Sequence, residues 1–315
     1  MSIFVYRNAN SDSARELAMS LGGRKIRSNE RLGFYYKNRE GVRVRLQFTP
    51  RDIVVGWGEA VPNNLQARVL NGAPIRSKFS DAQRLREAGV PTIEVSQTRP
   101  VVIPAPPPID PAIAAFEGVR ELIEDFPAAF GRSRVIRDGV QQLRGSLDAF
   151  IAAIDRPAPV APAARVDGEW LARMNNHVGG TDLLTPPARA DFFVRKLDLI
   201  REFRVHSFAG VSIRAGVKRE RVGFPNVHPW IRSFDAGWQI SYDGVSANRA
   251  MRELAHRAVA ALGLQFGAVD IGEKRDGSGL VVLEVNRAPG LADGTVARYS
   301  NAILRWSNNE LEAQA

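Results

Sequence analysis

Glu284 and Asn286 interrupt the apolar run Leu-Val-Val-Leu-Glu-Val-Asn at 280–286, which is typical of a β-strand. Side chains alternate between the two faces of a strand, so these two should project from one face together with Leu280 and Val282. Asp276-Gly277 predicts a hairpin turn. A hairpin centred there would place Asp270, on the preceding strand, opposite Glu284.

Two carboxylates and a carboxamide would then meet on a mostly apolar sheet. Like charges at that distance resist joint ionisation unless a cation neutralises them. Hard oxygen ligands without sulfur or imidazole favour Mg²⁺. The residue pattern is equally compatible with an exposed sheet face that happens to be polar.

Composition narrows the function classes. The 315-residue chain has no cysteine, which excludes disulfides, thiolate metal sites and a cysteine nucleophile. Its net charge is +9, but the basic residues look scattered, and their longest clusters are pairs such as Arg24-Lys25. Nucleic acid is therefore a possible partner that is not favoured over a solvated basic surface. Oligomeric state cannot be inferred from these residues.

The apolar runs predict no membrane segment, because none approaches the ~18–20 residues that a spanning helix needs. The amino-terminal residues are too short and polar a stretch for a signal peptide. We therefore expect a cytoplasmic protein.

The elements around the site follow a domain pattern. Residues 1–98 alternate strand and helix signals and predict a Rossmann-like α/β lobe, with strands at 2–6, 42–48 and 52–58 and helices at 11–23 and 78–89. Residues 99–165 predict proline-rich linkers flanking a helical hairpin insert. Beyond 166 the chain returns to strands and loops, with one strongly amphipathic helix at 246–263.

The segment 258–291, AVAALGLQFGAVDIGEKRDGSGLVVLEVNRAPGL, resembles the C-terminal signature of the ATP-grasp superfamily. That signature is a helix ending in Leu-Gly, an Asp at a strand end, and Glu-x-Asn before Pro-Gly. The resemblance implies an α/β (α+β) ATP-grasp fold with a central lid subdomain at 166–206 and a C-terminal subdomain at 207–315. It also implies that Asp270, Glu284 and Asn286 hold the Mg²⁺ that bridges the ATP phosphates.

Upstream segments resemble other parts of the family in the right order. Residues 200–220 look like its acid-x-Arg-Val strand and return strand, which implies that Glu202, Arg204 and Lys218 lie near the phosphates and the acceptor carboxylate. Residues 228–238 are similar to the Arg-Ser-Asn segment of the ribosomal-protein glutamate ligase group. Arg232 matches there, whereas Phe234 replaces the Asn.

Further residues are implied to contact the nucleotide. Lys78 matches the first nucleotide-contacting Lys, and Arg173 stands where most members have a Lys. The segment 170–184 resembles the glycine-rich lid over the triphosphate, and its loop would cradle phosphate with His177, Gly179, Gly180 and Thr181. In the hinge at 192–200, basic residues including Lys196 replace the acid that holds the ribose in many members.

The resemblance implies an ADP-forming, ATP- and Mg²⁺-dependent ligase that joins a carboxylate to an amine through an acyl phosphate. Arg204 and Arg232 would hold the acyl phosphate or acceptor carboxylate, while Lys78, Arg173 and Lys218 would neutralise the γ-phosphate. The substrates would be small molecules or peptides that no motif specifies. The alternatives are a non-catalytic ATP-binding protein and a nucleic-acid-associated protein on the same scaffold.

Overall fold

The computed structural model describes residues 1–62, 64–98, 170–175, 189–292 and 294–310. The chain divides into two compact units, one formed by Met1–Arg99 with Gly168–Ala315 and the other by Pro100–Asp167. The fold described below is that of the first unit. The predicted helical hairpin insert lies outside the described residues.

The amino-terminal lobe is an α/β sheet, as predicted, in the order β4-β3-β2-β1-β5-β6. Its parallel strands are β1 (Ile3–Tyr6), β2 (Arg24–Asn29), β5 (Ile53–Gly56) and β6 (Arg68–Leu70). The strands β3 (Gly33–Lys37) and β4 (Arg43–Arg45) extend it in antiparallel fashion. The sequence analysis missed β2 and β3, and it made β4 too long.

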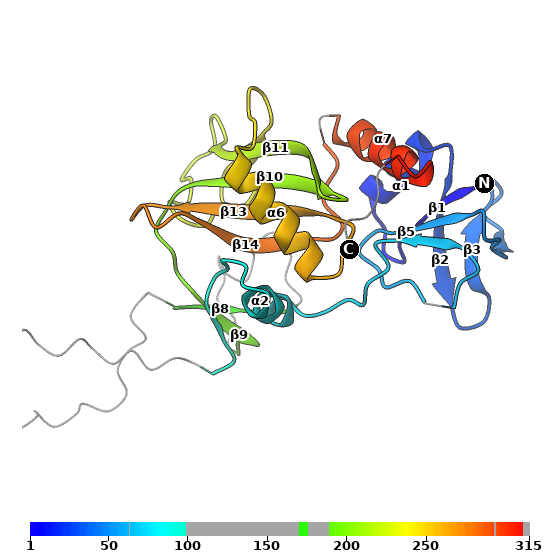
Figure 1. Ribbon diagram of the computed structural model, residues 1–315, viewed down its shortest axis with the longest axis horizontal. Helices are drawn as coiled ribbons and strands as arrows, with labels where there is room; N and C mark the ends of the chain where they lie inside the picture. The colour runs from blue at the N-terminus through cyan, green and yellow to red at the C-terminus, as the bar shows by residue number, and fades with distance from the viewer. Residues whose placement is uncertain (63, 99–169, 176–188, 293, 311–315) are drawn as a thin grey trace, which may run out of the picture. The chain divides into compact units, whose positions relative to one another are not determined.

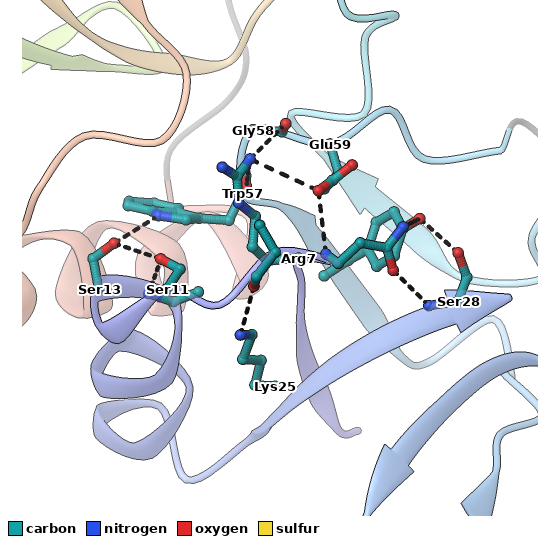
Figure 2. A network of polar contacts seen from close by, with 12 residues as sticks. Arg7, Ser11, Ser13, Lys25, Ser28, Trp57, Gly58 and Glu59 are labelled. Carbon is teal, nitrogen blue, oxygen red and sulfur yellow. Dashed lines mark hydrogen bonds and ion pairs between the residues drawn. The ribbon is translucent and has the colours of Figure 1, made fainter. Parts of the chain in front are cut away.

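Helix α1 (Asp12–Ser20) begins at Ser11, whose side-chain oxygen accepts from the backbone N–H of Ala14. Figure 2 shows the polar contacts around this start of α1, where the indole N–H of Trp57 donates to Ser13. The Trp57 ring is fully buried and packs against Phe266 and Tyr299 at centroid distances of 5.3 and 5.4 Å. Tyr299 belongs to α7 (Thr295–Ser307), so one core joins α1, β5, β13 and α7.

The second sheet is antiparallel, in the order β12-β11-β10-β13-β14 (Figure 1). Its strands are β10 (Leu199–Phe208), β11 (Val211–Glu220), β12 (Trp238–Ser241), β13 (Phe266–Lys274) and β14 (Leu280–Asn286). Helix α6 (Arg249–Ala261) packs across one face through residues such as Met251 and Leu254. This is the amphipathic helix that the sequence predicts, and the opposite sheet face remains for polar side chains.

A third, small sheet has the order β7-β9-β8, formed by β7 (Val95–Ser96), β9 (Phe192–Arg195) and β8 (Trp170–Arg173). Helix α2 (Lys78–Glu87) covers it through Phe79, which clusters with Phe192 and Val194. Thr92 bridges to Val282 of β14, which connects the end of α2 to the large sheet. Among the described residues no helix combines the length and hydropathy that a membrane crossing requires.

Candidate functional site

The β13–β14 hairpin confirms the predicted pairing of Asp270 with Glu284, and it places Asn286 opposite Ala268. The predicted strict alternation is wrong, because the register shifts after Asp270 and Ile271 pairs with Val282. Leu283 is the extra residue of this bulge. Val282 therefore joins Val285 in the core beneath α6, and does not share the face of Glu284.

Strand β10 brings Arg204 to the same face as Asp270, since the two residues are cross-strand partners. The Arg204 guanidinium donates from Nε to Oδ1 of Asp270 at 2.7 Å and from Nη2 to Oδ2 at 2.8 Å. Both side chains are largely buried. Burial opposes both charges, but the pair raises the pKa of Arg204 and, with Lys218, holds the pKa of Asp270 below its usual range.

Lys218 and Arg232 extend this pair into a chain of alternating charges. The Lys218 Nζ donates to Oε2 of Glu202 at 2.7 Å and lies 3.9 Å from Oδ2 of Asp270. The Arg232 Nε lies 3.8 Å from Oε1 of Glu202, and its Nη2 donates to the Leu199 carbonyl at 2.8 Å. Three cations thus face two carboxylates, so the cluster carries one excess positive charge that suits a bound anion.

The Lys78 ammonium lies 3.0 Å from Oε1 of Glu284, in an ion pair that is about one-third exposed. A second contact fixes α2, because Arg287 donates from Nη2 to Asp81 at 3.0 Å and from Nη1 to the Pro74 carbonyl at 2.6 Å. Asp81 and Lys78 are three residues apart and so lie on one side of α2. The Arg287–Asp81 contact therefore sets the position of Lys78 relative to Glu284.

A hollow of about 480 Å³ opens between α2, the small sheet and β14. Its polar wall includes Lys78, Arg173 and Glu284, three of the residues that the resemblance implies for nucleotide and metal binding. Its apolar wall is lined by Ile93, Val95, Phe192, Val194 and Leu283. An apolar wall beside a few convergent charges is typical of small-molecule sites of this size.

Other implied residues are not brought to this hollow. The Lys196 ammonium lies over the Trp230 ring, 4.8 Å from its centroid, and does not line the hollow. Phe234 is 63 % exposed with the Arg221 guanidinium 4.0 Å from its ring centroid. The predicted phosphate-loop residues His177, Gly179, Gly180 and Thr181 lie outside the described residues.

His206 is a component of the polar face that the sequence analysis missed. It follows Arg204 by two residues on β10, and its ring nitrogens lie 3.2 Å from the Tyr299 hydroxyl and 3.1 Å from the Tyr242 hydroxyl. Burial, helped by the positive charge of Arg204, lowers the pKa of His206 to about 3. The alternation that placed Glu284 with Asn286 would also have placed Glu202, Arg204 and His206 together.

The donor set fits a divalent metal ion. Asn286 has a buried amide nitrogen without a hydrogen-bond partner, so no protein contact to that nitrogen fixes the orientation of the carboxamide. A carboxylate has about four lone-pair sites, so Asp270 can still accept beyond its two bonds from Arg204. No group of three His, Cys, Asp or Glu side chains with metal-binding geometry occurs among the described residues, so a metal here would need the Asn286 oxygen.

The fold is similar to solved structures, although no family model matches the sequence and the search of curated proteins found no match. The ATP-grasp ligase PsnB, complexed with a minimal precursor, aligns with a TM-score of 0.51 at 13 % identity over 96 % of this chain and 99 % of its own. The macrocyclase MdnC from Microcystis aeruginosa MRC, bound with precursor peptide MdnA, aligns with a TM-score of 0.50 at 11 % identity over 98 % and 100 %.

Proposed function

We propose, from the ATP-grasp fold of this chain, that the protein is a ligase that uses ATP to join a carboxylate to an amine. The observation that carries the proposal is the excess positive charge of the buried cluster formed by Arg204, Asp270, Lys218, Glu202 and Arg232. A cluster of this kind on one sheet face suits phosphate or acyl phosphate bound beside it. The hollow next to Lys78 and Glu284 is the proposed ATP site.

The reaction would proceed in two displacements. A carboxylate oxygen of the acid substrate attacks the γ-phosphorus of ATP, the bond to the bridging oxygen breaks, and ADP leaves. The amine nitrogen then attacks the acyl carbon, the carbon–oxygen bond breaks, and phosphate leaves while the nitrogen loses a proton. Both steps depend on positioning and charge neutralisation rather than on a nucleophilic side chain.

Each part of the cluster has a proposed role in these steps. Lys78 and Arg173 would neutralise the triphosphate in the hollow, and Lys218 would act on the γ-phosphate as it is transferred. Arg204 and Arg232 would hold the acyl phosphate. Mg²⁺, when bound, would neutralise further phosphate charge, and Glu284 and Asn286 with Asp270 are the residues that would hold it.

A peptide is the carboxylate source that we favour. PsnB and MdnC were both solved with precursors, and each aligns over nearly the whole of this chain. The amine would come from the same peptide or from a separate molecule.

The test is ADP formation from Mg·ATP in the presence of acidic peptides, with hydroxylamine as the competing amine. An acyl phosphate intermediate is trapped as a hydroxamate, which mass spectrometry detects as an addition to a peptide carboxylate. Glu284→Gln should lower turnover by about a hundredfold or more, as expected for loss of a metal-binding carboxylate at a phosphoryl-transfer site. Glu253→Gln on the exposed side of α6 is the matched control. Full activity in Glu284→Gln would refute the metal assignment.

A second candidate function is nucleotide binding without ligation. The specific observation in its favour is that both oxygens of Asp270 accept from Arg204. Calorimetric binding of ATP without ADP or hydroxamate across the peptide screen would favour this function over the ligase.

A further inference from the structure

The positive charge of the chain is concentrated in one short stretch. Residues 24–45 hold eight lysines and arginines against two glutamates, which is two-thirds of the net charge of +9. These residues form β2, β3 and β4, the antiparallel end of the amino-terminal sheet. The sequence analysis described the basic residues as scattered, and the structure corrects that description.

The strand register places five of these cations on one face of the sheet. Arg27 pairs with Tyr35 and Tyr35 with Arg45, and Lys37 pairs with Arg43. Paired residues share a face, as do residues two apart on one strand. We call this surface the basic face and define it by Lys25, Arg27, Lys37, Arg43 and Arg45. The opposite face packs Ile26, Phe34 and Tyr36 into an apolar cluster.

The basic face lacks acidic partners. Throughout the described ranges, none of its five cations forms an ion pair with a carboxylate, and Lys25 instead donates to the Ala9 carbonyl at 2.9 Å. Burial and the neighbouring positive charges of Arg27 and Arg15 lower the pKa of Lys25. Gathered like charges destabilise a fold, so an anionic partner would relieve repulsion as well as gain attraction.

The backbone at the edge of this face is open. Strand β4 ends the sheet, and the N–H of Leu46 donates to Phe34 while the N–H of Asn38 donates to Val42. Inward bonding alternates along an antiparallel strand, so the N–H and C=O groups of Arg43 and Arg45 point away from β3. An extended peptide can add to such an edge by main-chain hydrogen bonds.

Protection against aggregation and binding of nucleic acid each account for less of this arrangement. Charges on an edge strand can serve only to prevent aggregation, but that role does not require Lys25, Arg27 and Lys37 on the inner strands. Single-stranded nucleic acid needs exposed aromatic rings for stacking, whereas Tyr35 is buried with the Arg43 guanidinium 5.3 Å from its ring centroid.

We propose that the basic face and the open edge of β4 bind an extended acidic segment of a peptide. Carboxylates on alternate residues of such a segment would lie over the basic face while its backbone pairs with Arg43 and Arg45. That this peptide is also the carboxylate substrate rests on the proposed ligase function, but the docking itself does not.

The test measures direct binding to the full chain without ATP. A fluorescein-labelled peptide of alternating Glu and Thr is titrated by anisotropy at low and high ionic strength, beside its Gln-Thr counterpart. We expect the acidic peptide to bind at least about tenfold more tightly at low salt and to lose that advantage at high salt.

Variants locate the site. Lys37→Gln/Arg43→Gln/Arg45→Gln should weaken the acidic peptide by about tenfold. Arg249→Gln/Arg252→Gln/Arg257→Gln removes the same charge from exposed positions of α6 and should bind as the wild type does. Thermal unfolding checks that both variants fold. Equal affinity in the two variants would overturn the proposal.

Two further probes complete the test. Peptide N-methylated at alternate residues should bind more weakly, and unchanged affinity would overturn pairing with the edge of β4. Tighter binding of oligothymidylate than of the acidic peptide would overturn the choice of partner. Because Glu284→Gln should bind the acidic peptide normally, loss of turnover with retained docking separates this inference from the ligase proposal.

Discussion

At the residue scale, buried charges in this protein are arranged in opposed pairs. Removing one member of a buried pair costs more free energy than removing both, because the remaining charge is left without a partner. Arg204 with Asp270, and Lys218 with Glu202, are the two tightest examples. His206, next to the first pair, is neutral instead, because two tyrosine hydroxyls contact its ring nitrogens.

His206 makes stability depend on pH. The unfolded chain binds a proton at this histidine below about pH 6.5, whereas the folded chain does so only near pH 3. Protonation therefore favours the unfolded state in that window, so the free energy of unfolding should fall by about 1 kcal/mol per pH unit as pH drops from 6 to 4. Urea unfolding at a series of pH values measures this slope.

The His206→Gln variant should remove most of the slope while keeping side-chain hydrogen bonding to the tyrosines. His256→Gln on α6 controls for loss of an imidazole elsewhere. The depressed pKa of Asp270 acts below its usual range near 4, so it contributes little between pH 6 and 5. A wild-type slope in His206→Gln would show that other groups cause the acid sensitivity.

At the element scale, the site depends on how α2 is held against β14. Lys78 begins α2 and Glu284 lies on β14, and their ion pair forms only when the helix keeps its position. The Arg287–Asp81 pair, which is largely buried, supplies that constraint one turn along. Burial raises the pKa of Asp81 even with Arg287 beside it, so Asp81 depends on this partner to remain ionised.

Arg287→Met should lower the free energy of unfolding by about 3 kcal/mol, since it leaves Asp81 buried without its cation. It should also raise the KM for ATP, because α2 no longer holds Lys78 beside Glu284. Arg287→Met/Asp81→Leu removes both charges and should recover much of the stability but not the KM. A double variant as unstable as the sum of the two single variants would show that the pair contributes no coupling.

Element types were predictable where periodicity was strong. The helix over 246–263 and the hairpin around Asp276-Gly277 follow from local pattern, as does the pairing of Asp270 with Glu284. The bulge at Leu283 was not predictable, because Leu283 and Val282 are equally apolar and only packing beneath α6 chooses between them. Strand β2 was missed because its polar residues face the solvent side of an edge-like ribbon.

At the scale of the whole molecule, composition gave the net charge but not its location. Strand register, with its period of two, turns cations spread over residues 24–45 into one face, and no run of adjacent charges announces it. The candidate site is distributed in the same way. Its residues come from α2, β8, β10, β11, β13 and β14, and only the tertiary fold brings them together.

The division of the chain into two compact units leads to a prediction about folding. The buried cores described above are formed by residues 1–99 and 168–315, without a contribution from the unit at 100–167. Deleting residues 105–160 and joining the ends with a short flexible linker should therefore leave the thermal unfolding temperature of the remaining unit within a few degrees of its original value. ATP binding, measured by calorimetry, should persist.

Deleting residues 295–315 provides the contrasting control. This truncation removes α7 and with it Tyr299, which packs against Trp57 and Phe266 in the core. Loss of a large buried aromatic side chain alone costs about 3–5 kcal/mol, which is comparable to the whole stability of many domains. The truncated chain should therefore fail to fold cooperatively while the 105–160 deletion folds. The reverse result would place the insert, rather than α7, in the core of the protein.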